Sequence, residues 1–160
     1  MILSVSRRTD IPAFYSEWFF NRLKEGFALV RNPMNPHQIS RVDISPKNID
    51  CIVFWSKDPE KIIGRLDELA GYTYYFQFTI TPYNRDIEPN LRDKREIFGT
   101  FVKLSEMIGR ERVIWRYDPV IVTGRFTLEW HLKAFESMAG KLCKYTDKCV
   151  ISFVDLYRKI

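Results

Sequence analysis

Long hydrophobic runs and paired cysteines are both lacking in this sequence. No apolar stretch approaches the ~18 residues that a membrane span requires. The apolar N-terminus meets Arg7 and Arg8 too soon to form the core of a signal peptide. We therefore expect a cytoplasmic protein without a membrane partner. The three cysteines, Cys51, Cys143 and Cys149, show no CxxC spacing, which argues against a disulfide framework and against a zinc site.

The signatures of several enzyme classes are missing as well. The sequence contains no Gly-rich phosphate loop, no GxSxG, no HExxH and no Rossmann fingerprint. Its two histidines, His37 and His131, have no nucleophile close to them in the sequence, so they identify no reaction class. Nothing in the sequence supports nucleophilic catalysis of the hydrolase type.

Composition points to one globular domain, and we expect residues 1–160 to form a single α/β domain. Apolar residues make up 46% of the chain and charged residues 28%, as in globular proteins generally. Lys plus Arg exceed Asp plus Glu by 25 − 20 = 5. A basic excess suits anionic ligands such as phosphates or nucleic acid, although a solvated basic surface explains it equally well.

Apolar periodicity alternates between strand and helix along the chain. The pattern predicts strands at 2–6, 27–31, 39–44, 51–55, 73–81, 112–116 and 149–154, with the second and third forming a hairpin. It predicts helices at 10–26, capped by Asp10, at 58–71, capped by Asp58, at 91–108 and at 128–142. Strands that alternate with helices indicate a parallel sheet with right-handed crossovers.

The strand at 73–81 distinguishes between two parallel architectures, an open doubly wound sheet and a barrel. Its alternate faces are apolar and polar: Tyr74, Phe76, Phe78 and Ile80 on one, Tyr75, Gln77, Thr79 and Thr81 on the other. A sheet with helices on both sides would be apolar on both faces. We therefore expect a partial TIM-like (β/α) barrel with a mainly parallel sheet. Because a full barrel has eight units, we expect the chain to be the N-terminal half of a longer barrel protein, truncated at its C-terminus.

Four predicted strands end in polar clusters. Ligands bind at the carboxyl ends of parallel strands, so we expect these clusters to share one crevice. They are Arg7-Arg8-Thr9-Asp10, Ser56-Lys57-Asp58, Pro82-Tyr83-Asn84-Arg85 and Arg116-Tyr117-Asp118.

This crevice carries our predicted site. We expect the cations to hold an anionic substrate and the neutral polar groups to hydrogen-bond it, which assigns substrate binding to Arg7, Arg8, Lys57, Gln77, Thr79, Arg116 and Ser152. Asp10 and Asp118 are the catalytic candidates, to orient the ligand or exchange protons.

Each assignment has a structural alternative. Asp10 fits a helix cap better than a catalyst, and Arg8 can pair with Asp10 or Asp118. Arg116 and Asp118 lie two residues apart on one strand face, so a purely structural ion pair explains them equally well. Lys57 fits a solvated loop lysine at least as well as a ligand-binding residue.

Several segments of the sequence resemble those of a known family. They are Ser6-Arg-Arg-Thr-Asp-Ile-Pro-Ala13, Val30-Arg-Asn-Pro33, Val53-Phe-Trp-Ser-Lys-Asp-Pro59, Phe76-Gln-Phe-Thr-Ile-Thr-Pro-Tyr83, Trp115-Arg-Tyr-Asp-Pro119 and Ile151-Ser-Phe-Val-Asp-Leu-Tyr157. With them the chain resembles the prokaryotic family catalogued as domain of unknown function 1848. The resemblance implies longer relatives whose C-terminal cysteine cluster is similar to the iron–sulfur ligands of radical S-adenosylmethionine enzymes. We expect no cofactor in this chain, because it ends before such a cluster. An iron–sulfur cluster and S-adenosylmethionine are expected only in a longer parent protein.

Two functional hypotheses follow. The first is a barrel protein that binds a small anionic ligand at its strand ends, as the substrate-binding part of an enzyme similar to the radical S-adenosylmethionine class. The second is a non-catalytic module that binds nucleic acid or phosphate. A partial barrel leaves sheet edges and apolar surface uncovered, so we also expect a homo-oligomer.

Overall fold

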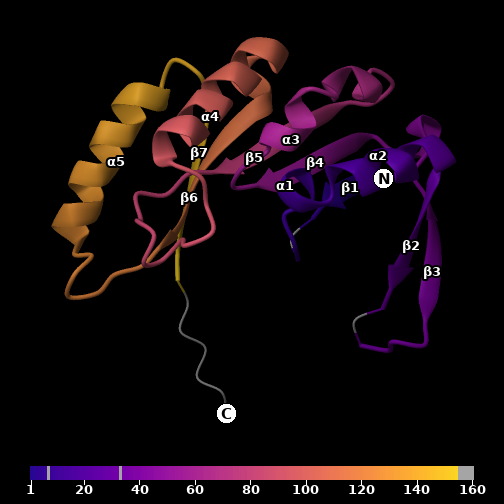
Figure 1. Cartoon of the computed structure of the whole chain (residues 1–160), viewed down its shortest axis with the longest axis horizontal. Helices are drawn as coiled ribbons and strands as arrows, with labels where there is room; N and C mark the ends of the chain where they lie inside the picture. The colour runs from indigo at the N-terminus through magenta and orange to yellow at the C-terminus, as the bar shows by residue number, and fades with distance from the viewer. Residues whose placement is uncertain (7, 33, 155–160) are drawn as a thin grey trace. The chain divides into compact units, whose positions relative to one another are not determined.

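Five strands form the main sheet of the computed structural model, in the order β1-β4-β5-β6-β7 (Figure 1). They are β1 (Ile2–Val5), β4 (Cys51–Ser56), β5 (Tyr74–Thr79), β6 (Val113–Val120) and β7 (Cys149–Phe153). β1 pairs with β4, β5 with β6 and β6 with β7, each time in parallel. The structure describes residues 1–6, 8–32 and 34–154. The predicted parallel α/β sheet is confirmed; its five strands do not close on themselves, and β1 and β7 are its edges.

The predicted hairpin is confirmed as a separate two-stranded sheet. β2 (Phe27–Arg31) and β3 (Ile39–Asp43) pair in antiparallel register, from Phe27 opposite Asp43 to Arg31 opposite Ile39. At its open end the Ile44 amide donates to the Gly26 carbonyl oxygen at 2.9 Å. Gly26 has a φ of 75°, so it supplies the left-handed residue that ends the preceding helix and starts β2.

The chain divides into two compact units. The first comprises Met1–Trp55 and Pro59–Tyr75, and the second comprises Ser56–Asp58 and Phe76–Ile160. The first unit holds α1 (Ile11–Phe14), α2 (Ser16–Glu25), the 3-10 turn η1 (Pro46–Asn48), α3 (Glu60–Ile63) and the 3-10 turn η2 (Leu66–Leu69). Its core contains Phe19 edge-on to Phe54, with ring centroids 5.4 Å apart.

Two helix predictions in the first unit need correction. The helix expected at 10–26 is broken at Tyr15, whose φ of −133° is not helical, so α1 and α2 are separate. The helix expected at 58–71 is only one turn of α3 followed by η2. The Asp58 cap was also wrong, because Pro59 occupies the cap position and α3 receives no side-chain cap. The Asp10 cap is confirmed, because its Oδ1 accepts from the Ala13 amide at 3.0 Å.

The second unit places two long helices against the apolar sides of its strands. α4 (Lys94–Ile108) and α5 (Leu128–Leu142) are capped by Asp93 and Thr127, and η3 (Arg110–Arg112) follows α4. Phe78 of β5 meets Phe101 of α4 with ring centroids 5.1 Å apart. Trp115 of β6 stacks on Phe135 of α5, also at 5.1 Å.

Alternation along β6 follows from these contacts. Val113, Trp115 and Tyr117 are buried on the helix side, so Ile114, Arg116 and Asp118 point to the opposite face. The apolar and polar faces predicted for residues 73–81 agree with this, since Phe76 and Phe78 are fully buried and Phe78 meets Phe101 of α4. No helix in the described ranges is long and apolar enough to cross a membrane.

Two exchanges to alanine on α4, one at a leucine and one at a methionine, test this packing. Leu104 is fully buried and Met107, one turn on, is exposed. We expect Leu104→Ala to lower the free energy of unfolding by about 2–5 kcal/mol, through lost burial and the cavity that remains. Met107→Ala should change it by less than ~0.5 kcal/mol. Urea denaturation followed by circular dichroism measures both, and equal effects would contradict the assigned orientation of α4.

Candidate functional site

A cluster of polar side chains lies on the face of β5, β6 and β7 that faces away from α4 and α5. Arg116 and Asp118 form an ion pair through Nη2 and Oδ2, with side chains 14% and 25% exposed. The Ser152 hydroxyl of β7 donates to Asp118 Oδ1. Arg116 Nη1 donates to the Gln77 Oε1 of β5 at 3.4 Å. Four residues from three strands thus share one polar cluster.

Strand register explains why these residues meet. Thr79 pairs with Arg116, and Arg116 pairs with Val150 of β7. Side chains in register point to the same face of a sheet, so Thr79 lies beside Arg116 and Ser152 lies two residues further along β7 on that face. The period-2 pattern of the sequence gives the face on which each residue lies, and the register brings these residues together.

Asp118 remains an anion at neutral pH. Burial raises the pKa of its carboxyl group, but the hydrogen bonds from Ser152 and Arg116, together with the positive charges of Arg116 and Lys57, outweigh burial. The net result is a pKa below the ordinary value. The Asp118 carboxylate is occupied by the Arg116 guanidinium. It can orient a cation or accept a proton only after Arg116 moves away or a ligand takes the place of Arg116.

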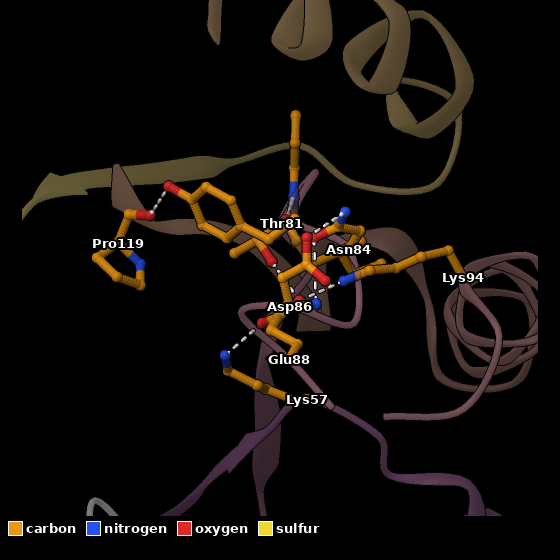
Figure 2. A network of polar contacts seen from close by, with 10 residues as sticks. Lys57, Thr81, Asn84, Asp86, Glu88, Lys94 and Pro119 are labelled. Atoms are coloured by element: carbon orange, nitrogen blue, oxygen red, sulfur yellow. Dashed lines mark hydrogen bonds and ion pairs between the residues drawn. The ribbon is translucent and has the colours of Figure 1, made fainter. Parts of the chain in front are cut away.

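Glu88 is the centre of a second cluster (Figure 2). Its Oε1 lies 2.5 Å from Lys57 Nζ, and its Oε2 contacts Lys94 Nζ and accepts from the Thr81 hydroxyl at 2.8 Å. Glu88 is only 8% exposed, so two ammonium groups compensate one buried carboxylate. Burial raises the pKa of Glu88, but the hydrogen bonds from Lys57, Lys94 and Thr81 outweigh it and leave the pKa below its ordinary value.

Within the second unit, an arginine fork holds the loop after β4. Arg92 Nε and Nη2 donate to the two carboxylate oxygens of Asp58, each at 2.6 Å, and Nη2 also reaches Thr100 Oγ1 at 2.9 Å. A bidentate pair of this kind fixes geometry as well as charge. Asp58, expected to cap a helix, instead anchors the segment that carries Lys57.

The structure brings together most of the predicted site residues of the second unit. Gln77, Arg116, Asp118 and Ser152 are in direct contact, and Thr79 is a register neighbour. Lys57 forms an ion pair with Glu88, and the positive charge of Lys57 lowers the pKa of Asp118.

The remaining predicted residues belong to the first unit. The Arg8 side chain is exposed and its backbone amide donates to Ser6 Oγ at 3.2 Å. Asp10 caps α1, and a catalytic role for it stays a prediction. Arg7 lies outside the described residues.

Glu88, Lys94 and Arg92 were not among the predicted site residues. Glu88 lies in the loop between β5 and α4, where the sequence shows no periodicity, whereas Arg92 and Lys94 lie at the start of the helix predicted at 91–108. One signal was available: the loops after parallel strands form the rim of the crevice, so an acid in the loop after β5 was a candidate.

Cys51, Cys143 and Cys149 are free thiols, and no group of three His, Cys, Asp or Glu residues within the described ranges could hold a metal ion. Burial raises the pKa of Cys149 to about 11, so this thiol stays protonated at neutral pH.

Comparison with family models gives one match, to the domain of unknown function DUF1848, over residues 2–160. The chain belongs to this family. The match covers the residues of both the Arg116–Asp118 cluster and the Glu88 cluster. Neither the curated proteins nor the solved structures provide a match.

Glu88→Gln tests the role of the buried carboxylate through pH. A depressed folded-state pKa contributes stability that is present above the ordinary value of 4.5 and is lost as the pH falls through the folded value. We expect Glu88→Gln to destabilise the protein by roughly 1–2 kcal/mol at pH 7 and by progressively less below pH 4.5.

Urea midpoints measured between pH 3 and 8 give this difference. Glu106→Gln, the same exchange at an exposed position of α4, is the control and should shift the midpoint little at any pH. A Glu88→Gln effect that does not change with pH would contradict the ionic role of Glu88.

Proposed function

We propose that the polar face of β5, β6 and β7 binds a small anionic ligand, with Arg116 as its principal contact. The observation that carries the proposal is the setting of this guanidinium, which is mostly buried and contacts Gln77 and Asp118, while Ser152 bonds Asp118 in turn. Buried arginines with several planar donors suit carboxylate and phosphate oxygens.

The charge balance around Arg116 supports an anion rather than a cation. Lys57, Lys94 and Arg116 are three positive groups, whereas Glu88 and Asp118 are two negative ones. Asp58 and Arg92 cancel each other. One positive charge is therefore left for a ligand. Gln77, Thr79 and Ser152 would then hydrogen-bond the ligand, and Asp118 would orient Arg116 or exchange a proton with the ligand.

The sheet also supports the finer hypothesis of a partial TIM-like barrel. In the second unit the helices pack on one face of the strands, while the opposite face is polar, as expected for a barrel interior. In a longer parent enzyme this face would hold the substrate, and the family resemblance implies radical chemistry that uses S-adenosylmethionine and an iron–sulfur cluster. Substrate binding by Arg8 and catalysis by Asp10 stay proposals for the first unit.

Two exchanges at the Arg116–Asp118 pair test anion binding. We expect Arg116→Gln to weaken the binding of inorganic phosphate at least tenfold, since the fork donor is lost. Asp118→Asn removes the competing carboxylate but keeps its shape, so phosphate should bind severalfold more tightly. Isothermal titration calorimetry at low salt measures both.

Arg110→Ala is the matched control, because Arg110 is an exposed arginine paired with Asp147 on the same unit. It should leave phosphate binding unchanged. Equal affinities in the wild type and in both pair variants would refute the site. Tighter binding of single-stranded DNA than of phosphate, with a steep salt dependence, would favour the nucleic-acid module instead.

Self-association is a further expected property. β7 is an edge strand, and its Ile151 and Phe153 are 50% and 62% exposed. An exposed apolar edge strand pairs readily with another chain. We expect light scattering to show a mass above that of one chain, and Phe153→Lys to shift the protein towards the monomer. A monomer at all concentrations would contradict this prediction.

A further inference from the structure

A second candidate binding site lies in the helix layer of the second unit. A cleft of about 410 Å³ opens between α4 and α5, next to the end of β5. The side chains that matter to its chemistry are Lys94, Phe98, Trp130, Lys133, Ser137 and Lys141. Because α4 and α5 cover the face of the sheet opposite Arg116, this cleft is distinct from the site proposed above.

Helical spacing aligns these side chains. Trp130, Lys133, Ser137 and Lys141 follow one another at intervals of three or four residues along α5, so they form one stripe over three turns. Lys94 and Phe98 stand four apart on α4 and face the same cleft. Two regular stripes thus line a groove that is cationic along its length.

The cleft carries positive charge that the described residues do not neutralise. Lys133 and Lys141 form no ion pair within the ranges that the structure describes, and Lys141 Nζ lies 5.8 Å from the centre of the Phe98 ring. Lys94 forms an ion pair with Glu88, but Glu88 is also paired with Lys57. Even with Lys94 assigned to Glu88, the two ammonium groups of Lys133 and Lys141 select an anion with more than one charge.

Aromatic rings form the other half of the lining. Trp130 is held in place by Tyr83, stacked at a centroid distance of 6.1 Å, and by Phe126 at 4.8 Å. Phe98 is only half-buried. A fixed indole and a second ring beside ammonium groups suit a flat ring attached to a phosphate.

We propose that the cleft between α4 and α5 binds a nucleotide, with Lys133 and Lys141 on its phosphates and its base against Trp130 and Phe98. The volume fits this class of ligand, since sites for small molecules span ~300–1,000 Å³. The Ser137 hydroxyl lies between the two lysines on the α5 stripe and can donate to a phosphate oxygen.

Titration with ADP tests the proposal, with heat and tryptophan emission as the two signals. We expect a dissociation constant below about 1 mM at low salt. The double variant Lys133→Ala/Lys141→Ala should weaken ADP binding at least tenfold. Adenosine and inorganic pyrophosphate should each bind more weakly than ADP, because each supplies only one half of the contacts.

Lys103→Ala/Lys144→Ala is the matched control, since both lysines are exposed on the same unit and neither lines the cleft. It should bind ADP as the wild type does. Three results would overturn the proposal: no ADP binding, equal binding by the Lys133/Lys141 double variant, or pyrophosphate binding to Arg116→Gln as tight as that of ADP. Loss of ADP binding in Arg116→Gln alone would place ADP on the polar sheet face instead.

Discussion

Placement of the helices on one side of the strands is the constraint from which the second unit follows. α4 and α5 cover the aromatic side of β5 and β6, where Phe78, Trp115 and Tyr117 are buried. On the other side of the strands, the polar groups must then find hydrogen-bond partners without the backbone or the side chains of a helix. Unpaired polar groups in a buried setting cost free energy, so Arg116, Asp118 and their neighbours bond one another.

The Arg116–Asp118 cluster can be a structural ion pair and a ligand site at the same time. Asp118 holds Arg116 in a fixed orientation while no ligand is bound, and Ser152 holds Asp118 in turn. A preorganised guanidinium loses little side-chain entropy when an anion arrives. The cost is competition, because the ligand must displace the Asp118 carboxylate, whose pKa burial raises but whose partners keep it ionised. The balance between these two terms determines the affinity.

Period-2 patterns made the strands and their faces predictable, because Gln77 and Thr79 alternate with Phe76 and Phe78 whatever the tertiary path. Local signals failed where a tertiary partner competed with them. Asp58 precedes a proline and fits a cap, yet the fork of Arg92, 34 residues away, binds its carboxylate more strongly than free amides would. Glu88 shows most clearly the limit of prediction from sequence. Nothing near it in the sequence indicates that Lys57 Nζ lies 2.5 Å from its Oε1.

Glu88 also relates the polar sheet face to the helix cleft. One of its oxygens serves Lys57, whose charge acts on Asp118, and the other serves Lys94, which lines the cleft. A phosphate that drew Lys94 away would leave Glu88 with Lys57 and Thr81 as partners, and the stronger hold on Lys57 would reduce its field at Asp118. Both charge balances therefore depend on one buried carboxylate. Its position in the aperiodic loop after β5 explains why a site built from strand ends alone is incomplete.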